Sequence, residues 1–145
     1  MIEHFKQVFI KGLDNLASEL LEFINEKDLW LVKQGISNSA GNLTLHLIGN
    51  LNHFIGAQVG HTGFIREREK EFSDKNIPVA VLIKHIDSIK EMLNETFSHL
   101  TNNDLTNIFP LNTFGENKTV HEVLIILTGH LNYHLGQINY YRRLN

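Results

Sequence analysis

Two histidines stand four residues apart in the segment GHLNYHLGQ, residues 129–137. Residues 120–127 before them are largely apolar, so we expect His130 and His134 to lie on a buried helix. Side chains at i and i+4 share one helical face with Cβ atoms ~5–6 Å apart, a separation at which two imidazoles can bind one metal ion. Burying an imidazole costs free energy unless its nitrogens find partners. The pair is therefore a candidate metal site, and hydrogen-bonded core histidines are the alternative.

A second helical stretch offers a third imidazole. His46, Asn50 and His53 have the spacing i, i+4 and i+7, and His46 is flanked by leucines that favour an inward position. A site of three histidines leaves open positions for water or substrate, as in catalytic zinc sites and those of related metals. His53 and His61 are rival third ligands because their spacing excludes neither.

Two amides lie one helical turn from the candidate ligands. Asn50 follows His46 by four residues, and Gln137 follows His134 by three. Each amide could hydrogen-bond a ligating imidazole or face a substrate, and plain packing is the alternative. No catalytic residue is assigned by the sequence.

The bulk composition limits the classes of function. The chain has 145 residues, of which 42% are hydrophobic and 20% charged, which predicts one globular domain over residues 1–145. The net charge of -3 argues against nucleic-acid and membrane partners. The first residues do not resemble a secretory signal, so we expect a cytoplasmic protein. Without cysteine, any metal needs non-thiolate ligands, and thiol chemistry needs a thiol from a substrate or cofactor.

The apolar spacing is helical almost throughout the chain. The first half predicts a helix over about residues 2–26, a loop over 33–42 and a second helix with Asn42 as its N-cap. The charged segment 61–76 is expected to be a solvated connection, although its glutamates could rim a pocket.

The second half predicts two more long helices. Pro78 suits the first turn of the third helix, whose apolar stripe continues to Leu100. Residues 101–118 form a long connection with a short extended piece around 108–111. Thr119 and Glu122 form a capping box for a fourth helix that ends near Arg143. The predicted fold is all-α, a four-helix bundle with a long third connection.

Two blocks of the sequence resemble the DinB-like superfamily of metal-dependent enzymes. Residues 43–73 resemble one subgroup's H-L-x-G-N-L followed by R-x-R-x-x-E-F, and residues 129–144 resemble its terminal H-x-x-x-H-x-G-Q with a basic helix end. The resemblance implies a four-helix bundle that often pairs into homodimers. It also implies one divalent metal ion, zinc, nickel or another, held by His46, His130 and His134, with His53 the weaker candidate.

The resemblance and the residues together favour a metal-dependent enzyme. The bound cation would activate water or an exogenous low-molecular-weight thiol such as bacillithiol or mycothiol, so the reaction class is hydrolysis or thiol transfer. The alternative is a non-catalytic dimeric helix-bundle interaction or stress-response protein whose metal is structural or absent. An adjoining cavity would favour the enzyme, whereas a metal enclosed by four or more protein ligands would favour the alternative.

Overall fold

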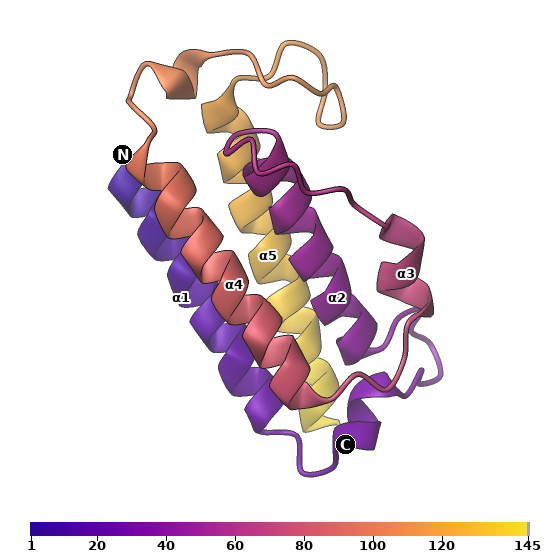
Figure 1. Ribbon diagram of the computed structural model, residues 1–145. Helices are drawn as coiled ribbons and strands as arrows, with labels where there is room; N and C mark the ends of the chain where they lie inside the picture. The colour runs from indigo at the N-terminus through magenta and orange to yellow at the C-terminus, as the bar shows by residue number, and fades with distance from the viewer. Residues whose placement is uncertain (145) are drawn as a thin grey trace.

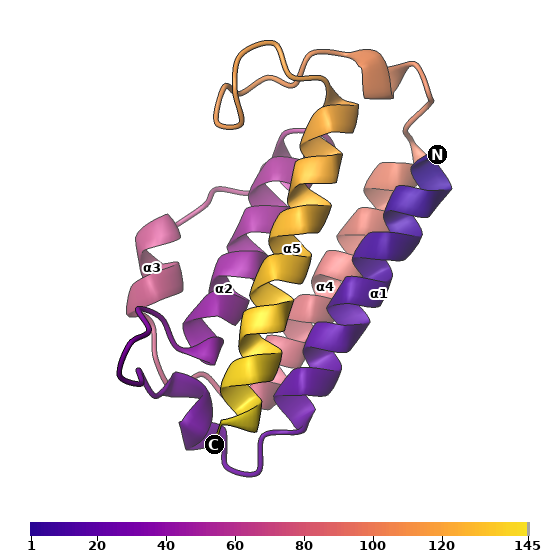
Figure 2. The same ribbon diagram turned by 180° about the vertical axis from the view of Figure 1, so that it is seen from behind.

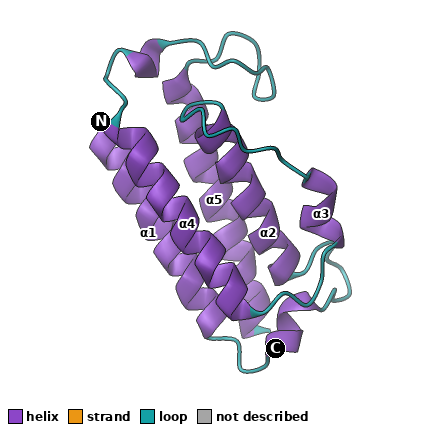
Figure 3. Cartoon of the chain, viewed as in Figure 1, coloured by secondary structure: helices purple, strands orange, loops and turns teal. Residues whose placement is uncertain are grey.

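Four long helices build the protein, whose computed structural model describes residues 1–144. They are α1 (Ile2–Leu21), α2 (Ala40–Leu51), α4 (Val79–Ser98) and α5 (Val120–Arg143), and they run side by side as a bundle (Figure 1). The described chain consists of helices and loops without a strand (Figure 3). The predicted fold class is therefore confirmed. None of the described helices is both long and apolar enough to cross a membrane.

The apolar stripes of the four helices meet in one core. Helix α1 contacts α4 and α5, and α2 contacts the same two helices from the other side (Figure 2). Leu13, Leu47, Ile86 and Leu131, one from each helix, are fully buried there. Full burial of such a side chain contributes ~1.5–3 kcal/mol relative to leaving it exposed. The core thus holds α2 and α5, the two helices that carry the candidate ligands, against each other.

The connection between α2 and α4 determines the topology. Helix α2 continues into a short π-helical segment, η2 (Asn52–Ala57), and the chain then returns along the bundle through the short helix α3 (Arg68–Ser73) before α4 begins (Figure 1). Helices α2 and α4 consequently run parallel. The third connection, residues 99–119, is long as predicted and contains η3 (Asp104–Thr106). The connection that crosses from one end of the bundle to the other is nevertheless the second one, between α2 and α4, and we call it the crossover.

Two predicted helix boundaries were wrong. The first helix ends at Leu21 instead of continuing to residue 26, and a 3-10 helix, η1 (Glu26–Trp30), begins after Asn25, whose side chain caps it. The N-cap of α2 is Ser39, whose hydroxyl accepts from the backbone N–H of Asn42. Asn42 itself lies inside the helix and is fully buried.

Other local predictions were confirmed. Thr119 and Glu122 form both hydrogen bonds of the capping box, and α5 ends at Arg143. Pro78 stands at the start of α4, as its N-cap. Where an extended piece was expected, around residues 108–111, the structure has an isolated β-bridge between Ile108 and Thr119.

Candidate metal centre

Three imidazoles from two facing helices converge inside the bundle. His46 on α2 and His130 and His134 on α5 each offer one ligand atom, and these three atoms all lie within 4.8 Å of one another. Nε2 of His130 lies 3.1 Å from Nε2 of His46 and 3.1 Å from Nε2 of His134. Nitrogens bound at 2.0–2.1 Å to one tetrahedral ion would lie about 3.3 Å apart. The spacing therefore fits a single metal ion.

The outer nitrogens of two rings have partners that determine their tautomers. Nδ1 of His46 lies 3.0 Å from Oε1 of Glu71, and Nδ1 of His134 lies 2.7 Å from Oε1 of Gln137. Both oxygens are acceptors, so both Nδ1 atoms carry the proton and donate. The lone pairs of both Nε2 atoms then point toward His130, as metal ligation requires.

His130 cannot satisfy both of these lone pairs by itself. A neutral imidazole has one N–H, so without a cation two lone pairs compete for a single proton on its Nε2. Nδ1 of His130 is buried without a hydrogen-bond partner among the described residues, as is Oδ1 of Asn50. When Nε2 binds a metal, the proton of the neutral ring is on Nδ1, which then becomes a donor. The polar groups thus fit a metal better than a hydrogen-bonded histidine cluster.

The rings of His130 and His134 are held in the neutral form that a metal needs. Burial first, and then the neighbouring His134, His46 and Arg66, together lower the pKa of His130 to about 4. Burial also lowers the pKa of His134, although its hydrogen bond to Gln137 opposes the shift. A lowered pKa leaves each ring unprotonated at neutral pH, so no proton has to leave these two rings when a metal binds.

A buried carboxylate from α3 orients His46. Glu71 is 6% exposed and receives two hydrogen bonds from Arg66, from Nε at 2.8 Å and from Nη2 at 2.9 Å. Burial raises the pKa of Glu71, but hydrogen bonds from His46 and Arg66 outweigh it, so the net pKa is lowered and the carboxylate stays ionised. Nη2 of Arg66 also lies 3.3 Å from Nδ1 of His46, but an ionised carboxylate only accepts, so this Nδ1 donates to Glu71.

Three further contacts hold α3 over the site. The amide nitrogen of Asn42 donates to the carbonyls of Glu71 and Asp74, each at 2.9 Å. The ring of Phe72 lies 5.1 Å from that of His46. The segment 61–76 is exposed at most positions, as predicted, but it is more than a connection, because Glu71 is buried and Arg66 and Phe72 are partly buried. Its R-x-R-x-x-E-F motif was the available signal, because six residues of helix are too few for periodicity to show a buried face.

Gly49 makes room for the Glu71 carboxylate. A Cβ at this position would lie 1.9 Å from Oε2 of Glu71, so any side chain would displace it. We expect Gly49→Ala to lower both metal affinity and the free energy of unfolding. Gly129→Ala is the matched control, since no atom lies within 4 Å of its added Cβ and helix propensity predicts a gain of ~0.5–1 kcal/mol. Metal titration and urea unfolding measure both effects, and a gain for Gly49→Ala would contradict the carboxylate's position.

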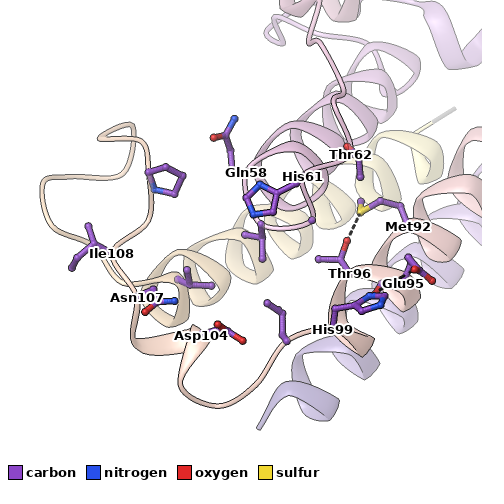
Figure 4. A pocket seen from close by; sticks show the side chains of 15 residues that line it. Gln58, His61, Thr62, Met92, Glu95, Thr96, His99, Asp104, Asn107 and Ile108 are labelled. Atoms are coloured by element: carbon purple, nitrogen blue, oxygen red, sulfur yellow. Dashed lines mark hydrogen bonds and ion pairs between the residues drawn. The ribbon is translucent and has the colours of Figure 1, made fainter.

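The rival ligands lie outside the cluster. His53 is half-buried on η2, its ring 4.7 Å from that of Phe54, and burial and then Arg66 lower its pKa. His61 is exposed and lines a separate cavity of about 670 Å³ between the end of η2, α4 and the third connection (Figure 4). That cavity also contains His99, Glu95 and Asp104, and none of the three clustered histidines lines it.

A different cavity adjoins the cluster. It has a volume of about 600 Å³ and is lined by His134 and Gln137 together with residues 33–38 and the last turns of α5. Nε2 of Gln137 donates to the Tyr133 hydroxyl at 3.3 Å, which continues the hydrogen-bonded row that starts at His134. The candidate site thus has a small-molecule-sized space beside one of its ligands.

The sequence model of one family matches residues 2–144. The chain belongs to the DUF1572 family. This family is described as proteins of unknown function and is generally placed in the DinB/YfiT-like clan. A search of curated proteins found no match. The DUF1572 chain accordingly has a buried cluster of three histidines that could bind a metal, within a family whose activity is not stated.

Proposed function

We propose that this DUF1572 chain is a metal-dependent enzyme of the DinB-like type that uses water or a low-molecular-weight thiol as nucleophile. The convergence of three Nε2 atoms, two of them with tautomers set by Glu71 and Gln137, carries the proposal. His46, His130 and His134 would hold one divalent ion. When bound, that ion would lower the pKa of a water or thiol and make it nucleophilic near neutral pH.

The protein's own groups would bind and orient the reactants. The cavity beside His134 offers the space, and the Gln137 amide and the Tyr133 hydroxyl offer hydrogen bonds along its wall. Glu71 would keep the proton on Nδ1 of His46, so Nε2 would stay available. With three protein ligands and an adjoining cavity, the arrangement favours the enzyme over an enclosed structural metal.

An activity assay with and without metal tests the proposal. We expect the metal-loaded protein to hydrolyse an activated ester, or to transfer bacillithiol, mycothiol or glutathione to an electrophile such as monochlorobimane. Chelation should abolish this turnover, and restoring the metal should recover it. Retained metal without metal-dependent turnover would contradict catalysis and identify the alternative, a non-catalytic bundle with a structural metal.

Other expectations from the sequence stay predictions. They are the pairing into a homodimer, the absence of nucleic-acid and membrane partners, and a cytoplasmic location. Sedimentation of the metal-loaded protein would measure the first of them directly.

A further inference from the structure

The cavity beside His134 has walls of two kinds. Its apolar part includes Leu43 at the start of α2 and the exposed rings of Tyr133 and Tyr140 on α5. Its polar part includes His134 on α5 and Lys33 on the loop before α2. A cavity of about 600 Å³ with these walls is large enough for a small organic molecule.

Lys33 is the only charged Lys, Arg, Asp or Glu side chain among the described residues that line this cavity. Its Nζ donates to the Tyr141 carbonyl at 3.3 Å and lies 4.6 Å from the centre of the Tyr141 ring. These contacts hold the ammonium group at the wall while using one of its three N–H donors. The remaining donors are available to an acceptor inside the cavity.

A second positive charge lies next to the cavity. The Arg143 guanidinium lies 5.2 Å from the centre of the Tyr140 ring. The charged side chain in the wall, Lys33, and the one next to the Tyr140 ring, Arg143, are thus both cationic, and the described lining residues include no carboxylate side chain, although the chain carries a net charge of -3. Such a cavity concentrates anions.

We infer that this cavity binds a small organic carboxylate. The carboxylate group of the bound molecule pairs with Lys33, and its apolar body lies against Tyr133 and Tyr140. The opposite end of the molecule approaches His134. The approach of this opposite end to His134 rests on the proposed function, because it places the reacting end of the ligand at the metal centre. Lys33 then determines the preference of the cavity for a negatively charged ligand over a neutral one.

A pair of probes with the same phenylbutyl skeleton, one ending in a charged carboxylate and the other in a neutral hydroxyl, tests the inference. Titration calorimetry compares 4-phenylbutyrate with 4-phenylbutan-1-ol on the protein as purified. We expect the acid to bind about tenfold more tightly than the alcohol, because it gains a charge-assisted hydrogen bond. Lys33→Met should remove this preference, whereas Lys84→Met, at an exposed position on α4 outside the cavity, should keep it. Tyr140→Ala should weaken both probes alike.

The same titrations after chelation separate this inference from the proposed function. Acid binding that persists without metal and depends on Lys33 supports the inference even if no activity is found. Acid binding that is lost on chelation and unchanged in Lys33→Met would mean that the carboxylate binds the metal, and would overturn it. Equal affinities of the two probes, or no saturable binding of the acid, would also overturn it. Lys33→Met is expected to retain metal at the wild-type level.

Discussion

Replacing His130 by alanine is expected to reduce the metal content of the purified, untagged protein from about one ion per chain to near zero. His130 is the central ligand, since its Nε2 lies 3.1 Å from those of both other rings. Its loss leaves His46 and His134 as two ligands on different helices. We expect the dissociation constant to rise by more than about a hundredfold, beyond what loss of an outer hydrogen-bond partner costs. Elemental analysis and competition with a chelating dye measure the effect.

The control variant is His85→Ala, which removes an exposed histidine on α4 outside the cluster and should leave the metal content unchanged. Unfolding curves add a second readout. Metal that binds only the folded state raises the melting temperature of the wild type, and His130→Ala should lose that increase. Without metal, the variant should unfold close to the wild type, because it also removes a buried nitrogen that has no hydrogen-bond partner in the described part of the chain. Undiminished metal content in His130→Ala would refute the site.

The largest stability effect is expected for Glu71→Leu. The change leaves the Arg66 guanidinium, whose side chain is 11% exposed, without its partner and leaves Nδ1 of His46 without an acceptor. Removing one member of a buried ion pair typically costs ~3–5 kcal/mol. Losing the group that orients a ligating histidine typically weakens metal binding by ~10–100-fold. Urea unfolding and metal titration on the same samples measure the two losses.

The double variant Arg66→Leu with Glu71→Leu separates these effects. Removing both charges together should recover most of the lost free energy of unfolding, since no unpaired charge stays buried. Metal affinity should stay low, because Nδ1 of His46 still lacks its acceptor. If the double variant also regained full metal affinity, Glu71 would act through folding alone and its role in orienting His46 would be wrong.

Sequence reasoning succeeded where the signal is local or periodic. The capping box at Thr119 and Glu122 involves residues three apart, and the long amphipathic stripes determine the bundle. The three histidines that were singled out do lie together, because His130 and His134 share a helical face and His46 lies on the facing helix. A spacing pattern within a long helix therefore carried most of the candidate site.

What sequence reasoning missed depends on contacts between distant segments. Asn42 was expected to cap its own helix, but its amide instead holds the end of α3, some thirty residues later in the chain. Glu71 was grouped with solvated glutamates because nothing in a charged segment shows which carboxylate is buried. Only docking of α3 against α2, with Gly49 leaving the space, distinguishes Glu71 from its neighbours.

The position of α3 on the crossover has a consequence for the order of folding. The metal ligands come from α2 and α5, while the carboxylate that orients His46 comes from the connection between α2 and α4. The high-affinity site is complete only when α2, α5 and this crossover have reached their native places. A metal ion would therefore bind tightly at a late step of folding, and chains with an undocked crossover would lose it in competition with other metal-binding molecules in the cell.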